Sequence, residues 1–467
     1  MRSLLRSLCL NLPSMAGAIL LGTCVWSRLT FGPVWFEQLA YHLRFGASGL
    51  LQADSTTTWQ FALLVLVVPL LVTGAIAWPA RRHRWMPGAV FLVGLAAFFT
   101  TFRIGSYVSS FFGPDVFAAH ELPATAVKIS AHGAPRSLLL IYVESLEAGY
   151  QEPERFGSDL VPRLSALQGR HASVQRFHQA EGAHWTVAGI VASQCGVPLK
   201  VSLLPPPEDR RFGLRRFLPG ARCLGDVLAE RGYENVFMNG PDLAFADLGT
   251  FLRDHGYSRR YGAREWIAEG TDPDSLRHWG LRDAPLMARA RSELDRLMAS
   301  GKPFNLTVLT VDTHGPRGLL GAHCRERGSS DFRGIIDCLD QDVSDLLQEI
   351  ERRGWLGRLS VVVLGDHIAM ENPLMDQLAA GERRIFNLWM HEPTLPTDRD
   401  DILHFDWYPT LLWMTGWRAE GGRLGLGYCF LQACAAPPVP DGRLELFRKD
   451  LLNRSPRYDA LWMEDPE

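Results

Sequence analysis

The sequence predicts an α/β protein whose N-terminal part is built from transmembrane helices. Two observations carry this prediction. Uncharged apolar stretches long enough to cross a bilayer are confined to the first 113 residues, whereas short apolar runs alternate with helix-like segments over the rest of the 467-residue chain. Strands that alternate with helices indicate a mixed, mostly parallel sheet with helices on its faces.

Three apolar stretches make up the predicted membrane domain, residues 1–113. The segments 61–78 and 86–102 carry no charged residue, and about 18 such residues suffice to cross a bilayer. The weaker stretch 8–26 is either a third helix or a cleaved signal peptide. We favour a retained helix, because no small-x-small cleavage site followed by a polar start is evident.

Basic residues orient these helices. Arg2 and Arg6 precede the first stretch, and the sequence RRHR at 81–84 separates the second from the third. Loops rich in Lys and Arg stay in the cytoplasm. Three crossings then leave everything after about residue 113 on the other side of the membrane.

Charge and cysteine content narrow the function classes. A net charge of −3 argues against a nucleic-acid binder, and 47% hydrophobic residues exclude a wholly disordered chain. An even number of cysteines in an oxidising compartment suggests disulfides, with free buried thiols as the alternative. The residues alone leave every pairing open among Cys195, Cys223, Cys324, Cys338, Cys429 and Cys434.

The region outside the membrane is divided by composition. Residues 114–136 are predicted to form a linker, 137–440 the α/β domain and 441–467 a C-terminal tail. The apolar runs predicted as strands are 137–143, 235–238, 304–311, 359–364 and 385–390. The segments predicted as helices are 223–231, 286–299 and 340–353.

Acidic residues and histidines directly follow three of the predicted strands. Glu144 follows the first, the triplet 312–314 (Asp-Thr-His) the third, and Asp366 with His367 the fourth. Ligand sites in such sheets lie at the carboxyl ends of the strands, and carboxylates with imidazoles are metal ligands. Each residue alone could be an ordinary solvated strand end. Glu147 is either a supporting acid or a surface carboxylate.

The segment 181–199 contains a candidate nucleophile. Thr186 opens an apolar run, 187–192, that is predicted to be a buried helix. A hydroxyl at a helix N-terminus lies where backbone N–H groups favour negative charge, and a metal ion would lower its pKa further. The residues alone favour the alternative, in which Thr186 only caps the helix.

Six motifs resemble those of the sulfatase-like membrane transferases of the alkaline phosphatase superfamily. This family includes lipoteichoic acid synthases and phosphoethanolamine transferases. The motifs are IYVESLE (141–147), HWTVAGIVASQCGVPL (184–199), FADLGTFLRDHGY (245–257), TVDTHGP (310–316), GDHIAM (365–370) and HFDWYPTLLWMTG (404–416). The sequences of segments 184–199 and 365–370 are most similar to those of phosphoglycerol transferases that modify osmoregulated periplasmic glucans.

The resemblance implies an α/β/α domain of the sulfatase or alkaline phosphatase type and a role for each matching residue. Thr186 corresponds to the family's nucleophile. His314 corresponds to a histidine that binds the transferred headgroup or assists proton transfer. One divalent ion, Mn²⁺ before Zn²⁺ or Mg²⁺, would be held by Glu144, Thr186, Asp366 and His367.

The chain also departs from the family. The Trp and Arg with which lipoteichoic acid synthases hold glycerol phosphate fall at Ala246 and Leu248 here, so headgroup contacts must differ. Asp242 is a candidate substitute, and His184, close to Thr186, is a candidate phosphate contact. The disulfides that the resemblance implies are Cys195 with Cys223 and Cys324 with Cys338, whereas a bond between Cys429 and Cys434 stays open.

The implied activity is metal-dependent transfer of phosphoglycerol from phosphatidylglycerol to a periplasmic glucan or related glycan. It would proceed through a covalent phosphothreonine and release diacylglycerol, on a multi-pass protein of the bacterial inner membrane whose catalytic domain is periplasmic. The alternatives are phosphoethanolamine transfer to a glycan or lipid A, and an inactive membrane protein that binds lipid or glycan. A true sulfatase is disfavoured, because no C/S-x-P-x-R motif occurs at the nucleophile position.

Overall fold

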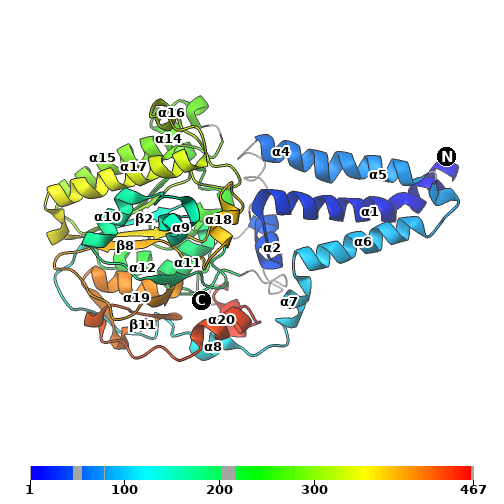
Figure 1. The fold of residues 1–467 in the computed structure, drawn as a ribbon. Coiled ribbons are helices and arrows are strands. Elements are labelled where there is room, and N and C mark those ends of the chain that lie inside the picture. The colour runs from blue at the N-terminus through cyan, green and yellow to red at the C-terminus, as the bar shows by residue number, and fades with distance from the viewer. Residues whose placement is uncertain (1, 46–54, 78, 201–215, 277, 464–467) are drawn as a thin grey trace. The chain divides into compact units, whose positions relative to one another are not determined.

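The computed structural model describes residues 2–45, 55–77, 79–200, 216–276 and 278–463 (Figure 1). The chain divides into two compact units, Met1–Phe111 and Phe112–Glu467. The first unit is helical, and the second contains a sheet covered by helices.

The first unit is organised around one long helix. α1 (Arg2–Phe31) packs against α6, α5 and the adjoining π-helical turn η1. A Cβ atom added to Gly17 or Gly94 would collide with the backbone of the other helix, so these glycines allow α1 and α6 to approach closely. The remaining helices are α2 (Phe36–Phe45), α4 (Ser55–Phe61), η1 (Ala62–Val67), α5 (Val68–Ala77), η2 (Pro79–Arg81), α6 (Met86–Thr101) and α7 (Ile104–Ser109).

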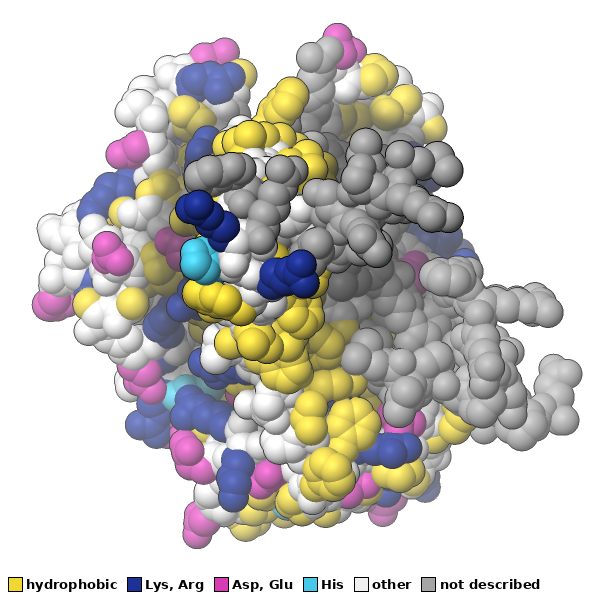
Figure 2. Space-filling view, turned by 90° about the vertical axis from the view of Figure 1, so that its right-hand side faces the viewer, with side chains coloured by type: hydrophobic (Ala, Val, Ile, Leu, Met, Phe, Trp, Pro, Cys, Tyr) yellow, Lys and Arg dark blue, Asp and Glu magenta, His cyan; other side chains and the backbone are white. Residues whose placement is uncertain are grey.

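Two helical segments of this unit are long and apolar enough to cross a membrane. They are Asn11–Phe31 and Thr56–Ala77, whereas Met86–Thr101 is shorter. Among the described residues, the exposed large apolar side chains lie in this unit except for Phe112, Ile267 and Met463. Figure 2 shows one face on which hydrophobic side chains gather, with Lys, Arg and His side chains beside them. Three membrane crossings stay a prediction, because the third apolar helix, Met86–Thr101, is shorter than the other two.

The second unit is built on a six-stranded sheet with the order β5-β4-β6-β2-β7-β8. All neighbouring strands are parallel except β7 and β8. This confirms the mixed, mostly parallel sheet. The strands are β2 (Ser137–Val143), β4 (Glu234–Asn239), β5 (Arg259–Tyr261), β6 (Phe304–Leu309), β7 (Leu359–Gly365) and β8 (Asn387–Met390).

Helices cover both faces of this sheet (Figure 1). On one face α10 (Pro162–Arg170), α15 (Asp283–Ser300) and α17 (Phe332–Arg352) pack on Leu139, Ile141 and other buried side chains. On the other face lie α11 (Thr186–Cys195), α12 (Leu224–Ala229) and α19 (His404–Met414). Because alternate residues of a strand point to opposite faces, each central strand reads as a continuous apolar run.

Short elements complete the second unit. The small strand pairs are β1 (Ile129–Ala131) with β10 (Trp417–Ala419), β3 (Arg176–His178) with β9 (Asp401–Leu403), and β11 (Arg423–Leu424) with β12 (Gly427–Tyr428). The further helices are α8 (Val116–His120), α9 (Pro153–Phe156), α13 (Leu248–Asp254), α14 (Ala263–Ala268), α16 (Ala322–Glu326), α18 (Met375–Ala379), α20 (Arg443–Asp450) and α21 (Pro456–Ala460). The segments predicted as linker and tail thus contain structure of their own.

Candidate active site

Two parallel strands bring the central acidic residues together. β2 and β7 pair in a register that places Val143 beside Gly365, so the residues that follow both strands start level. Glu144 follows β2, and Asp366 and His367 follow β7. All three are buried, and their potential ligand atoms lie within 4.8 Å of one another. We call these three residues the carboxylate–histidine cluster.

The hydrogen bonds of the cluster leave Oδ2 of Asp366 and Nε2 of His367 as acceptors that face each other. Oδ1 of Asp366 accepts the backbone N–H groups of Ser145 (2.8 Å) and His367 (2.9 Å). Its buried Oδ2 has no hydrogen-bond partner and lies 3.4 Å from Nε2 of His367. Nδ1 of His367 is 2.8 Å from the Ile368 carbonyl. Nδ1 must therefore carry the proton in the neutral ring, which leaves the Nε2 lone pair facing both carboxylates.

The electrostatics fit a cation at this point. Burial and, to a smaller extent, the Glu144 carboxylate raise the pKa of Asp366 to about 7, although His367 acts in the opposite direction. Two carboxylates in one buried site cannot both ionise cheaply unless a cation or a proton lies between them. Two carboxylates and one imidazole form a donor set that suits a divalent transition metal. The described residues thus fit the metal that the family resemblance implies.

Thr186 lies beside the cluster at the start of α11. Its Oγ1 donates to Oε2 of Glu144 at 3.2 Å and is 3.5 Å from Nε2 of His367. The N-cap residue is Trp185, so the alternative in which Thr186 only caps the helix is wrong. A Cβ atom on Gly189 would collide with the Asp366 carbonyl, so this glycine lets α11 run close to the cluster.

His314 approaches the cluster from the loop after β6. The loop is tied to Glu144, whose N–H donates to Oγ1 of Thr310 (3.0 Å) and whose carbonyl accepts from Oγ1 of Thr313 (2.5 Å). Nδ1 of His314 lies 2.7 Å from the Gly315 carbonyl, which leaves Nε2 for a ligand. Burial by itself would raise the pKa of Glu144, but the imidazoles of His314 and His367 lower it below its usual value.

The other two predicted contacts, His184 and Asp242, each have a charged partner of their own. Nε2 of His184 is 3.5 Å from the Glu181 carboxylate. Asp242 pairs with Arg264 (2.6 Å) and accepts the N–H of Ala244. Within the described part of the chain, no contact brings Asp242 to the carboxylate–histidine cluster. Ala246 and Leu248 are both buried, and neither side chain carries a polar group.

Two buried side chains, Glu147 and His404, hydrogen-bond to the backbone at or next to the cluster residues. Glu147 is fully buried, so the surface interpretation is wrong. It accepts the N–H of Ala369 and forms an ion pair with Arg383. Nε2 of His404 donates to the Asp366 carbonyl at 2.9 Å, and burial lowers the pKa of this imidazole to about 3. No sequence motif indicated Arg383.

Disulfides hold the surrounding helices. The bond between Cys195 and Cys223 joins the end of α11 to the residue preceding α12, and Cys324–Cys338 joins α16 to α17. A third bond links Cys429 and Cys434. The first bond anchors the end of α11 that lies farthest from Thr186.

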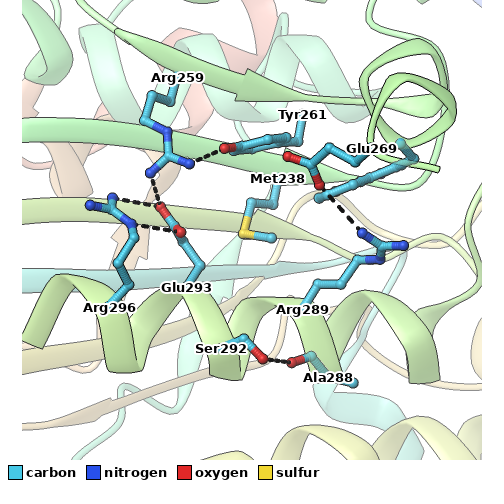
Figure 3. A pocket seen from close by; sticks show the side chains of 10 residues that line it. Met238, Arg259, Tyr261, Glu269, Ala288, Arg289, Ser292, Glu293 and Arg296 are labelled. Atoms are coloured by element: carbon cyan, nitrogen blue, oxygen red, sulfur yellow. Dashed lines mark hydrogen bonds and ion pairs between the residues drawn. The ribbon is translucent and has the colours of Figure 1, made fainter. Parts of the chain in front are cut away.

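A separate pocket of about 430 Å³ lies between β4, β5, α14 and α15 (Figure 3). None of its lining residues belongs to the carboxylate–histidine cluster. Its arginines are paired within the protein: Arg259 and Arg296 with Glu293, and Arg289 with Glu269. The guanidinium groups of Arg289 and Arg259 also lie over the rings of Trp266 and Tyr261. The network braces the edge strand β5.

Comparisons with known proteins show the family of the chain. Residues 136–416 match the family model described as Sulfatase. Phosphoglycerol transferase I of Xanthomonas euvesicatoria pv. vesicatoria (strain 85-10) is 32% identical over 372 residues, which cover 76% of this chain and 52% of that protein. Phosphoglycerol transferase I of Escherichia coli O127:H6 is 32% identical over 331 residues, with 67% and 42% covered. The chain thus spans about half the length of these curated relatives.

A solved structure, one of those that match, shares the fold. It is a protein of the alkaline phosphatase superfamily from Vibrio parahaemolyticus, with a TM-score of 0.51 and 21% identity, covering 71% of this chain and 81% of that chain. The α/β/α fold that the six motifs imply is therefore confirmed.

Proposed function

This chain belongs to the sulfatase family, and from that premise we propose that it transfers phosphoglycerol from phosphatidylglycerol to a glycan hydroxyl, releasing diacylglycerol. The observation that carries the proposal is the position of Thr186. Thr186 is the first residue of α11, and its hydroxyl donates a hydrogen bond to Glu144 of the carboxylate–histidine cluster. The relatives named phosphoglycerol transferase I support the choice of headgroup.

The proposed cofactor is one divalent metal ion, Mn²⁺ with Zn²⁺ or Mg²⁺ as alternatives. Glu144, Asp366 and His367 would hold it together with Oγ1 of Thr186, since Oδ2 of Asp366 and Nε2 of His367 already face the same point. When bound, the ion lowers the pKa of the Thr186 hydroxyl and neutralises phosphate charge.

In the first step Oγ1 of Thr186 attacks the phosphorus atom. As it attacks, its proton passes to Oε2 of Glu144, the carboxylate oxygen to which it is hydrogen-bonded. The bond between phosphorus and the diacylglycerol oxygen breaks, and that oxygen takes up a proton that Nε2 of His314 can supply. The N–H groups at the start of α11 favour the negative charge that develops there. Phosphoglycerol remains bound to Thr186.

In the second step a glycan hydroxyl attacks the same phosphorus atom. It gives up its proton to His314, the bond between phosphorus and Oγ1 of Thr186 breaks, and Thr186 regains its proton from Oε2 of Glu144. Both steps depend mainly on positioning and charge stabilisation, as in phosphoryl transfer generally.

We propose a bacterial inner-membrane location with the second unit in the periplasm. Two helical segments of the first unit have the length and apolar composition of membrane spans. The three disulfides of the second unit suit an oxidising compartment. An anchored enzyme stays close to its lipid donor.

The test is transfer from vesicles that contain phosphatidylglycerol labelled in its headgroup to periplasmic glucan. The wild type should label the glucan, and Thr186→Ala should lower transfer at least about 10³-fold while metal content and melting temperature stay nearly unchanged. Thr250→Ala on α13 is the matched control and should keep full activity.

The outcome also separates the alternatives. Full activity of Thr186→Ala would overturn the nucleophile assignment. Label transferred only from phosphatidylethanolamine would identify a phosphoethanolamine transferase. Vesicle binding without transfer from either lipid would identify a binding protein.

A further inference from the structure

An aromatic side chain covers the imidazole of His314. The ring centroids of Trp279 and His314 lie 4.2 Å apart at an interplanar angle of 35°. Phe245 meets the Trp279 ring edge-on, with centroids 5.2 Å apart at 81°. Phe245 lies within the family motif 245–257, but the motifs offered no signal for Trp279. The indole thus lies between the candidate headgroup histidine and a second aromatic ring.

The backbone that carries Trp279 is unusual. His278, Trp279 and Gly280 have φ angles of 54°, 66° and 80°. For a residue with a side chain this left-handed conformation costs on the order of 1–2 kcal/mol. Such strain persists only where the surroundings hold it, and it is concentrated at functional sites.

The surroundings do hold this segment. Leu281 donates its N–H to the Gly240 carbonyl at 3.0 Å, and a Cβ atom on Gly280 would collide with that carbonyl. The buried Asp283 carboxylate accepts the N–H groups of Val311 (2.7 Å) and Asp312 (3.0 Å), in the loop that carries His314. The Trp279 segment and the His314 loop are therefore locked together.

We propose that Trp279 is a positioning residue of the headgroup subsite. Its indole holds the imidazole of His314 so that Nε2 faces the phosphoryl group, and the same ring contacts the carbon atoms of the headgroup. The proposal rests on the proposed function and adds a specificity element to it.

The headgroup that Trp279 would contact follows from the proposed function, which makes it a glycerol. Of the neighbouring acids, Asp283 accepts backbone N–H groups, and Asp312 accepts the N–H of Asp283 (3.2 Å) through Oδ2, whereas its Oδ1 lies 3.7 Å from Arg282 and has no hydrogen-bond partner among the described residues. An indole face packs against the C–H groups of a polyol and also attracts an ammonium group, so the comparison of the two headgroup phosphates below decides between them. A glycerol headgroup needs only an apolar face and hydroxyl partners.

The first test follows binding directly. The full chain is labelled with 5-fluorotryptophan, loaded with Mn²⁺ or the diamagnetic Zn²⁺, and its Trp279 ¹⁹F signal is assigned from the spectrum of Trp279→Phe. Glycerol phosphate should shift that signal at a lower concentration than ethanolamine phosphate, and inorganic phosphate should shift it least. Calorimetry on the same samples reports saturation. A Trp279 signal that stays still at saturating glycerol phosphate overturns the proposal.

The second test is a double-mutant cycle on transfer from phosphatidylglycerol vesicles. Trp279→Leu should lower kcat/KM about 10–100-fold, because a displaced catalytic group costs that much. Trp279→Phe should restore most of the loss. In a His314→Ala background, Trp279→Leu should add less than about 3-fold, since residues that act through one another are not additive. Fully additive losses overturn the positioning role.

The controls separate this proposal from the proposed function. Trp355→Leu removes a half-buried tryptophan from the turn that follows α17 and should leave kcat/KM unchanged. Successful transfer by the wild type with a silent ¹⁹F signal refutes the role of Trp279 alone. A shifted signal without any transfer refutes the proposed function and keeps Trp279 as a ligand contact.

Discussion

The second unit contains two centres of buried carboxylates, Asp406 and the carboxylate–histidine cluster, and they differ in how their negative charge is compensated. Asp406, in α19, is fully buried and is met by Arg443 (2.6 and 2.9 Å) and Arg399 (3.0 Å). Backbone N–H groups of Leu403 and Tyr428 also donate to it. Burial by itself would raise the pKa of Asp406, but the two arginines lower it well below its usual range.

Among the residues that the structure describes, no arginine or lysine pairs with the carboxylate–histidine cluster. Oδ2 of Asp366 has no hydrogen-bond partner, and burial next to Glu144 raises the pKa of Asp366 to about 7. Burial alone thus does not distinguish a binding site from a structural brace. The difference lies in whether the protein supplies the positive charge or leaves it to a ligand.

The largest expected effect comes from neutralising the uncompensated centre. Asp366→Asn keeps an oxygen for the N–H groups of Ser145 and His367 but removes the charge. Transfer should fall about 10²–10³-fold with loss of metal. In chelator the free energy of unfolding should rise by about 1–3 kcal/mol, because a buried unpaired charge is gone. Metal analysis and chemical denaturation of the full chain measure both. Lower stability of the metal-free variant would contradict the comparison.

The next largest effect comes from unpairing the compensated centre. Arg443→Met leaves Asp406 without its bidentate partner and should lower the free energy of unfolding by about 3–5 kcal/mol. Metal affinity should not change. Arg448→Met, on the same helix at a largely exposed position, is the control and should cost less than about 1 kcal/mol. An equal loss of unfolding free energy in the two variants would show that the Asp406 ion pairs do not stabilise the fold.

Glu147 is an intermediate case, since Arg383 compensates it while it supports the loop after His367. Glu147→Gln retains an acceptor for the Ala369 N–H and should cost about 1–3 kcal/mol of stability. Its effect on transfer should be well below that of Asp366→Asn. The exposed Glu154→Gln serves as the reference in both assays. A loss of activity equal to that of Asp366→Asn would place Glu147 within the site itself.

The smallest effect between successive pH values is a pH dependence of opposite sign for the two centres. A folded pKa of about 7 for Asp366, against about 3.9 unfolded, means that the metal-free protein loses stability as pH rises from about 4 to 7. The slope is at most about 1.4 kcal/mol per pH unit. Asp406 has a lowered folded pKa, so its stabilisation is present above about pH 4 and is lost only on further acidification. Denaturation at pH 5, 6 and 7 should show a slope that Mn²⁺ or Asp366→Asn removes.

Much of the fold and part of the site could be predicted from local patterns. The apolar runs at 137–143, 304–311 and 359–364 are visible because a buried strand needs consecutive apolar residues, and acids that follow them fall at one edge of a parallel sheet. The strand 259–261 was missed, since Arg259 and Arg260 give it no apolar run. Trp279 and Arg383 were missed because their partners are distant in sequence.

The sequence by itself determined which segments are apolar, which residues end the strands and where Thr186 opens a helix, because these properties depend on neighbouring residues. The tertiary structure decided which charges are compensated. The register of β2 with β7 sets Glu144 beside Asp366, and the return of α20 brings Arg443 to Asp406. Long-range packing fixes the dielectric and the partners of a buried group, so it alone separates a centre that requires a ligand from one that stabilises the fold.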